Sequence, residues 1–135
     1  MQNLLAILFI TFFCTVSSFG QTQTQMNKEA AEAYKIADAE LNQVYQKILQ
    51  EYSSDSSFVE ALKVSQRNWI EYRDSELRLK YPEKEQGFYG SVYPMCISYY
   101  MTELTTERIE KLQIWLTGIE EGDVCAGSVK RIDPK

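Results

Sequence analysis

The chain has 135 residues, of which 44% are hydrophobic and 24% are charged, and its 19 acidic and 14 basic residues give a formal net charge of −5. This acidic balance excludes nucleic acid as an expected partner, because binding to phosphates depends on clustered Lys and Arg. The sequence has no histidine, which is the commonest general base and metal ligand, and no glycine-rich phosphate loop. We therefore expect no enzyme activity, no catalytic residues, no metal and no cofactor.

The first twenty residues predict an export signal that is removed from the mature protein. Residues 4–16 are apolar apart from two threonines, and this run is shorter than the roughly 18–20 residues that a membrane span needs. Ser18 and Gly20 supply the small residues after which signal peptidase cuts. An uncleaved membrane anchor is the alternative. After cleavage we expect a soluble protein, periplasmic or secreted, with no membrane contact.

All charged residues lie beyond residue 20, so the mature chain keeps the full charge of −5. This charge suits binding to a basic protein partner. It equally suits a secreted protein whose surface only has to stay soluble. The composition leaves both explanations open.

Two amphipathic helices are predicted at residues 26–52 and 57–81, because hydrophobic residues recur there at steps of three and four. The serine-rich run between them ends the first pattern, since serine side chains compete for backbone hydrogen bonds. Ser57 and Glu60 have the spacing of a capping box and are expected to start the second helix. Pro82 ends that helix, because the residue before a proline disfavours helical geometry.

A loop at residues 83–91 follows, with two glycines and two aromatic residues that we expect to be exposed. It is long for a helix connection, which usually has about two to eight residues, and this leaves room for function. A third helix is predicted at residues 92–117, with Pro94 in its first turn and Gly118 as its C-terminal cap.

The fold class expected is all-α, with three long antiparallel helices in an up-down-up bundle and an irregular C-terminal tail. We divide the chain into a signal peptide (1–20), one helical domain (21–119) and a polar tail (120–135). The tail is expected to be irregular because it is polar and contains glycine and proline.

Two cysteines, Cys96 and Cys125, remain beyond the predicted signal, and export favours their oxidation. The third helix carries the chain roughly 31 Å away from Cys96. A disulfide therefore needs the tail to lie back along the helix, almost fully extended. We favour two free thiols over a disulfide.

The second helix contains the run QRNWIEYRDSE, which combines aromatic residues with charges of both signs. Trp69, Tyr72 and Glu76 share one face with Arg73 beside them, since residues three or four apart meet on a helix. Burying polar groups unpaired costs about 1–3 kcal/mol each. We therefore expect hydrogen bonds to other helices, an ion pair from Arg73 to Glu76 or Glu40, and largely buried Trp69 and Tyr72. A structural role is favoured over a ligand site.

Four parts of the chain carry a recognisable pattern. They are DAELNQVY at 38–45, QRNWIEYRDSE at 66–76, GSVYPM at 90–95 followed by LTTER at 104–108, and EEGDVC at 120–125. In order and spacing they resemble the domain named after the lysozyme inhibitor LprI, over residues 26 to about 125. Within the pattern we assign a structural role to Glu40, Asn42, Tyr45, Gln66, Trp69, Tyr72, Arg73, Asp74, Glu76 and Arg108.

The chain departs from the family pattern in its cysteines. The positions where family members commonly carry cysteine hold Glu29, Leu77 and Tyr100. The usual cross-links of the family are therefore absent, whereas the helix motifs do not depend on them.

The resemblance implies a small secreted or envelope-associated helical protein that binds a protein partner, a basic lysozyme, and blocks its cleft. Lysozymes cleave with paired carboxylates in an open groove, and an acidic wedge complements such a basic enzyme. We place the partner contacts on Glu83, Glu85, Phe88 and Tyr89. The alternative is a non-enzymatic envelope scaffold or interaction protein that assembles through its aromatic helices. An enzyme of unknown chemistry is the weakest alternative.

Overall fold

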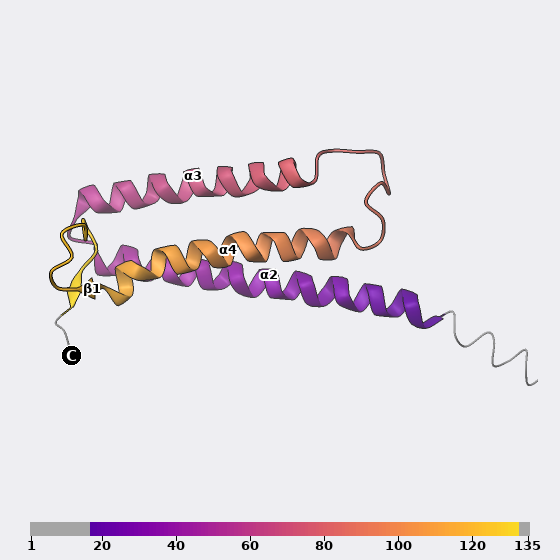
Figure 1. The fold of residues 1–135 in the computed structure, drawn as a ribbon, viewed down its shortest axis with the longest axis horizontal. Coiled ribbons are helices and arrows are strands. Elements are labelled where there is room, and N and C mark those ends of the chain that lie inside the picture. The colour runs from indigo at the N-terminus through magenta and orange to yellow at the C-terminus, as the bar shows by residue number, and fades with distance from the viewer. Residues whose placement is uncertain (1–16, 133–135) are drawn as a thin grey trace, which may run out of the picture.

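The computed structural model describes residues 17–132, with side chains from residue 22 onward. In that part of the chain the elements are, in order, α2 (Ser17–Glu51), α3 (Ser56–Lys80), α4 (Tyr93–Thr117), β1 (Ile119–Glu120) and β2 (Arg131–Ile132). The helices run up, down and up again, so that α2 and α4 point the same way and α3 runs antiparallel to both (Figure 1). The predicted all-α, up-down-up architecture is confirmed.

Helix α2 begins at Ser17, earlier than the predicted start near residue 26. The run of glutamine and threonine before residue 26 contains no proline, so no residue in that run has to break the helix. The Asn27 side chain donates a hydrogen bond to the carbonyl of Ser91 at 3.2 Å, which ties this part of α2 to the start of α4. Of the predicted export signal, residues 1–16 lie outside the described residues, and its last four residues belong to α2.

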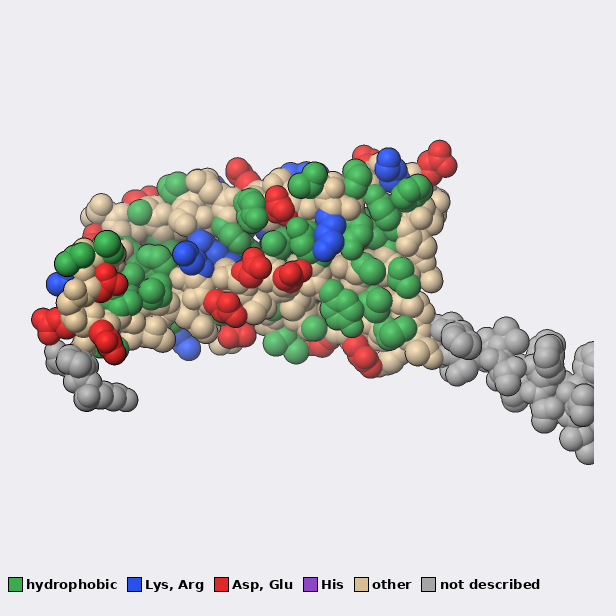
Figure 2. All heavy atoms as spheres, viewed as in Figure 1, with side chains coloured by type: hydrophobic (Ala, Val, Ile, Leu, Met, Phe, Trp, Pro, Cys, Tyr) green, Lys and Arg blue, Asp and Glu red, His purple; other side chains and the backbone are tan. Residues whose placement is uncertain are grey.

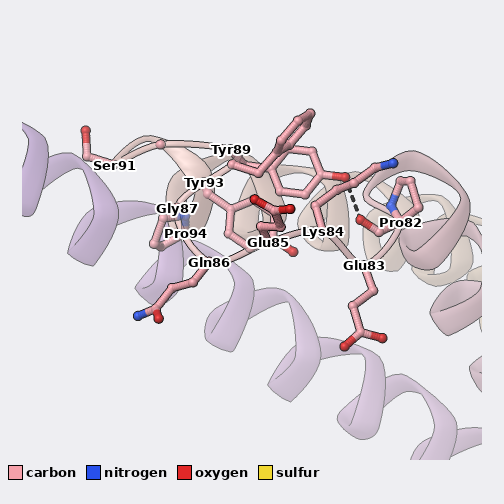
Figure 3. A pocket seen from close by; sticks show the side chains of 12 residues that line it. Pro82, Glu83, Lys84, Glu85, Gln86, Gly87, Tyr89, Ser91, Tyr93 and Pro94 are labelled. Atoms are coloured by element: carbon pink, nitrogen blue, oxygen red, sulfur yellow. Dashed lines mark hydrogen bonds between the residues drawn. The ribbon is translucent and has the colours of Figure 1, made fainter.

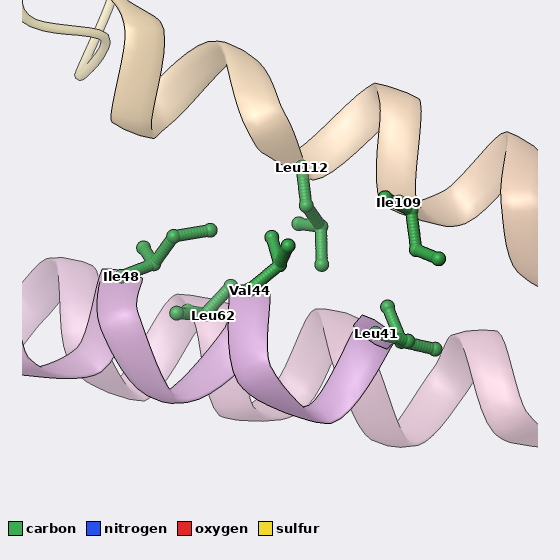
Figure 4. Packing of buried hydrophobic residues seen from close by; sticks show 6 residues of the cluster. All are labelled: Leu41, Val44, Ile48, Leu62, Ile109 and Leu112. Atoms are coloured by element: carbon green, nitrogen blue, oxygen red, sulfur yellow. The ribbon is translucent and has the colours of Figure 1, made fainter. Parts of the chain in front are cut away.

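The hydrophobic core lies mainly between α2 and α4, which form the closest pair of helices. Its buried members are Leu41, Val44 and Ile48 from α2, Leu62 from α3, and Ile109 and Leu112 from α4 (Figure 4). Steps of three and four along α2 place its members in one stripe, and burying each such side chain contributes about 1.5–3 kcal/mol. Helix α3 supplies a single member, so it packs on the α2–α4 pair more loosely than they pack on each other.

Helix α3 starts at a different cap from the one predicted. Asp55 is the N-cap, and its carboxylate accepts a hydrogen bond from the backbone N–H of Phe58 at 2.9 Å. Aspartate is among the best N-cap residues, and Ser57 then lies inside the first turn. The predicted capping box of Ser57 and Glu60 is wrong, and Glu60 instead pairs with Lys63 at 2.9 Å.

The other helix boundaries agree with the sequence signals. Helix α3 ends at Lys80, just before Pro82. Pro94 occupies the first turn of α4, and Gly118 caps its end with a φ of 79°.

The C-terminal tail is more ordered than predicted. Strands β1 and β2 pair in parallel, with Ile119 opposite Arg131 and Glu120 opposite Ile132. Ala126, in the segment 121–130 between the strands, is buried, with 6% of its surface exposed. Residues 121–130, between the strands, form turns without regular secondary structure, so the predicted irregular tail is confirmed there. The structure adds the short strand pair, which is held by contacts of the tail with Trp115 and Glu51 at the helix ends.

We call this end of the bundle the tail end: Tyr52, Phe58 and Trp115 with residues 119–132. Tyr52 and Phe58 stack with ring centroids 4.3 Å apart, and Trp115 lies 6.3 Å from Phe58. The Trp115 indole N–H donates to Ser128 Oγ at 3.0 Å, so the tail is bound directly to the aromatic cluster. The two cysteines in the described part of the chain are free thiols, Cys96 partly buried in α4 and Cys125 exposed in the tail.

Hydrophobic side chains also reach the surface. Figure 2 shows one face of the bundle, on which they gather along the seam between α3 and α4 with charged side chains of both signs among them. None of the helices in residues 17–132 is long and apolar enough to cross a membrane.

Candidate functional site

The connection between α3 and α4, residues 81–92, forms the end of the bundle opposite the tail. Its path is set by turns at Gly87 and Gly90, whose φ angles of 84° and 72° favour glycine. Phe88 N–H donates to the Glu85 carbonyl at 3.1 Å, and Gly90 N–H donates to the Gly87 carbonyl at 3.0 Å. The Tyr89 hydroxyl closes the loop by donating to the carbonyl of Pro82 at 2.6 Å (Figure 3). These bonds give the loop a defined shape without regular secondary structure.

Four aromatic rings fill this end, which we call the loop end: Tyr81, Phe88, Tyr89 and Tyr93. Tyr89 stacks on Tyr93 with ring centroids 4.8 Å apart, and Tyr81 meets both edge-on at 5.5 Å. Phe88 packs edge-on against Tyr89 at 5.0 Å, yet 65% of its surface is exposed. Burial, and then the neighbouring Cys96 thiol, raise the pKa of the Tyr81 hydroxyl above its ordinary value of 10.0.

A cavity of about 430 Å³ opens within this loop and is lined by residues 82–91 with Tyr93 and Pro94. The predicted partner-binding residues Glu83, Glu85, Phe88 and Tyr89 all line it, so the fold brings them together. Both carboxylates are exposed, and neither takes part in an ion pair within the described residues. Tyr89 is only half-exposed, contrary to the expectation of two exposed aromatics, because it stacks between neighbouring rings.

The motif on α3 does form hydrogen bonds to other helices, as its mixed face predicted. Arg108 Nε donates to Gln66 Oε1 at 3.1 Å, and the Tyr100 hydroxyl donates to Glu76 at 3.4 Å. Lys80 lies 3.7 Å above the ring of the same Tyr100. Burial, and then the nearby carboxylate of Glu76, raise the pKa of the Tyr100 hydroxyl above its ordinary value of 10.0.

The predicted ion pair of Arg73 has a different partner. Its guanidinium binds the carboxylate of Asp74 at 2.8 Å rather than Glu76 or Glu40. It also donates to the hydroxyl of Tyr34 on α2 at 3.5 Å. Glu40 is exposed on α2, and Glu76 is occupied by Tyr100, so the neighbouring residue in the sequence supplies the counterion.

Burial of the motif differs from the prediction in one residue. Trp69 is half-buried and packs against the core, whereas Tyr72 is 52% exposed. Tyr72 is exposed because α3 stands away from the other helices and leaves part of its inner face uncovered. On α2, Tyr45 packs against the core, and Asn42 bonds within its own helix to the Asp38 carbonyl at 3.0 Å.

Sequence reasoning missed the residues that support the loop, Tyr81 and Tyr93. The available signal was a pair of Tyr-Pro dipeptides, Tyr81-Pro82 and Tyr93-Pro94, which flank the loop on both sides. Proline fixes the backbone where the chain leaves and enters a helix, and a tyrosine before each proline can meet its counterpart across the loop.

No cluster of three or more metal-binding side chains occurs in residues 17–132. The loop end instead offers an exposed phenyl ring and two unpaired carboxylates on a fixed support, which is a surface suited to protein contacts.

Comparison with known proteins agrees with the sequence pattern. The model of the family described as lysozyme inhibitor LprI matches residues 14–112. An uncharacterized protein of Rhizobium meliloti (strain 1021) is 34% identical over 103 residues, which cover 68% of this chain and 72% of the relative. No solved structure matches the chain. The protein therefore belongs to the LprI family.

Proposed function

We propose that this protein is exported to the periplasm or secreted and that it inhibits a lysozyme by placing its loop end in the enzyme's cleft. The observation that carries the proposal is Phe88, which is 65% exposed on a loop whose neighbouring rings are packed. A large aromatic side chain presented on a rigid support is typical of the residues that dominate protein interfaces.

The loop at residues 81–92 has two acidic residues and one basic residue, Lys84, so its net charge is −1, which supports a basic partner. Glu83 and Glu85 are exposed and lie on the same loop as Phe88. Their carboxylates, together with a net charge of −5, attract a basic enzyme. Membership of a family described by lysozyme inhibition supports the choice of lysozyme among such enzymes.

A lysozyme turbidity assay with the purified protein tests the proposal. Phe88→Ala should weaken inhibition about thirtyfold, which corresponds to the loss of an interface hot spot. Replacing Glu83 and Glu85 together by Gln should weaken it roughly threefold or more, because each exposed charge pair contributes little. Inhibition should also weaken as salt rises, since ions screen charges over about 8–10 Å.

The matched control replaces Glu120 and Glu121 at the tail end by Gln, which removes the same charge from the opposite end. Inhibition should not change in this variant. If both double variants lose the same inhibition, the overall charge and not the loop end is responsible. Unchanged inhibition in the loop variants would move the contact surface elsewhere.

A scaffold role is the second candidate, and the exposed apolar residues of α3 favour it. Val64, Ile70 and Leu79 are 46%, 41% and 75% exposed, respectively. Absence of lysozyme inhibition by the intact protein at micromolar concentration would favour this alternative. Size-exclusion chromatography would then show whether replacing Leu79 and Ile70 by Ser reduces self-association.

A further inference from the structure

A second cavity lies along the seam of α3 and α4, away from the loop end. Its volume is about 260 Å³, and it is lined by Trp69 and Tyr72 from α3 and by Leu104, Glu107, Arg108 and Lys111 from α4. Apart from Lys111, which lies three residues after LTTER, these residues belong to the segments QRNWIEYRDSE and LTTER that carry the family resemblance. The proposed inhibition of lysozyme uses none of them.

Arg108 is half-buried at this cavity without a counterion. Its Nε donates to Gln66 Oε1 at 3.1 Å and its Nη2 donates to Ser65 Oγ at 3.0 Å, and both acceptors are neutral. Within residues 17–132 no carboxylate lies within 4.0 Å of its guanidinium. Burial lowers the pKa of Arg108 below its ordinary value of 12.5, but a guanidinium stays charged in a protein.

Arg73 provides the comparison within the same motif. Its guanidinium lies 5.3 Å from the Trp69 ring centroid and that of Arg108 lies 5.9 Å from it, so two cations contact one indole. Arg73 is neutralised by Asp74 at 2.8 Å. Arg108 has no such partner. A charge withdrawn from water is costly unless it is paired, so the cavity holds a positive charge that an anion would neutralise.

The remaining lining defines what kind of anion fits. Leu104 is 7% exposed and, with the Trp69 ring, gives the cavity an apolar wall. Lys111 and Glu107 are exposed, and neither forms an ion pair in the described part of the chain. Their charges offset each other, which leaves the single positive charge of Arg108 and favours a singly charged ligand.

We propose that this cavity binds a small carboxylate, whose oxygens bind Arg108 and whose apolar part packs on Trp69 and Leu104. Guanidinium and carboxylate groups match in geometry and form charge-assisted hydrogen bonds. The volume lies below the roughly 300–1,000 Å³ of pockets for drug-sized ligands. The ligand is therefore a short-chain organic acid or the acidic side chain of a peptide, which present the same group.

Nuclear magnetic resonance of the Trp69 indole N–H tests the proposal, with hexanoate as the probe and hexanamide as its uncharged equivalent. The protein has two tryptophans, and Trp115→Phe identifies which signal belongs to Trp69. Hexanoate should shift the Trp69 signal saturably, and hexanamide should not. A blocked peptide with a single Glu distinguishes the two sources, since tighter binding than hexanoate identifies a peptide. Equal shifts with hexanoate and hexanamide, or none with hexanoate and the peptide, would overturn the proposal.

Charge substitutions give a second test. Arg108→Gln should weaken hexanoate binding about tenfold or more, because it removes a charged hydrogen-bond donor. Arg67→Gln is the matched control. Arg67 is exposed on α3, one of the two helices that form the seam, but it does not line the cavity. This substitution removes the same charge and should leave binding unchanged.

Two exposed residues keep the test valid if Arg108→Gln fails to fold. Lys111→Gln should weaken binding and Glu107→Gln should strengthen it, each about two- to fivefold, which is the effect of one exposed charge. The effects must have opposite signs. If both variants, with folding verified by circular dichroism, bind hexanoate equally, the carboxylate does not occupy this cavity.

Discussion

The two ends of the bundle are both built from clustered aromatic side chains, but the chain covers only one of them. At the tail end, the Tyr52 hydroxyl donates to the Trp115 carbonyl at 3.0 Å and accepts from the N–H of Lys130 at 3.2 Å. Lys130 also pairs with Glu51 at 2.5 Å, which attaches the tail to α2. At the loop end, the Tyr89 hydroxyl bonds within its own loop, and Phe88 stays exposed.

An aromatic cluster alone therefore does not indicate whether a surface is structural or available for binding. Stacking distances are similar at the two ends, 4.3 Å for Tyr52 and Phe58 and 4.8 Å for Tyr89 and Tyr93. What differs is the chain that follows. Residues 119–132 fold back on the tail end, whereas the loop end is covered only by the loop itself.

The largest expected effect comes from removing one large side chain at each end and comparing stability. Trp115→Ala should destabilise the fold by about 3 kcal/mol, because it removes a large ring that packs on the core and the partner of Ser128. Phe88→Ala should change stability by no more than about 0.5 kcal/mol, since its ring is largely exposed. Urea denaturation followed by circular dichroism measures both. Similar losses would mean that the loop end is as structural as the tail end.

A smaller loss of stability is expected from substituting Gly118, the glycine on which the tail packs closely. Gly118 has φ 79° and ψ 179°, a region that is essentially confined to glycine. A Cβ there would lie 2.8 Å from Cγ2 of Ile132 and 2.9 Å from the Lys130 carbonyl. Gly118→Ala should therefore cost about 2 kcal/mol from backbone strain and displaced tail.

Gly127→Ala separates strain from contact. Gly127 has φ 57°, and nothing lies within 4 Å of its would-be Cβ, so the substitution should cost only about 1 kcal/mol of left-handed strain. The same denaturation measurement applies. Equal costs at the two glycines would show that close packing of the tail on Gly118 contributes nothing.

The sequence indicated the helices well because their signals are local. Hydrophobic residues at helical steps, Pro82 and Gly118 each act on their own neighbours in the chain. The cap at Asp55 was missed because Ser57 with Glu60 offered an equally local pattern two residues later. The pairing of β1 with β2 was not predicted, because two-residue strands leave no period to detect. Contacts of the tail with Tyr52, Glu51 and Trp115, from distant parts of the sequence, hold the pair in place.

The candidate site was predictable in place but not in detail. The loop and its four predicted residues do meet at one cavity. That Tyr89 is packed and Phe88 exposed depends on where Tyr81 and Tyr93 lie, which follows from the relative placement of two helices. In the same way, the sequence predicted that one face of α3 is partly polar. The ion pair of Arg73 with Asp74 and the exposure of Tyr72 depend instead on how far α3 lies from α2 and α4.

The smallest expected effect is a pH dependence at the loop end, where Tyr81 is one of three tyrosines with a raised pKa among the described residues, the others being Tyr34 and Tyr100. Because burial and then Cys96 raise the pKa of Tyr81 above 10.0, folding favours its neutral phenol. This contribution to stability is fully present below pH 10.0 and is lost as the pH rises through the raised folded pKa. The difference in tyrosinate absorbance between the wild type and Tyr81→Phe isolates the ionisation of Tyr81, which should occur above pH 10.0. Cys96→Ala should lower the pKa of Tyr81 without returning it to 10.0, because burial is the larger cause and remains. Ionisation of Tyr81 at its ordinary pKa in the wild type would mean that solvent reaches the ring cluster freely, and the loop end would then be less well packed than the stacked rings indicate.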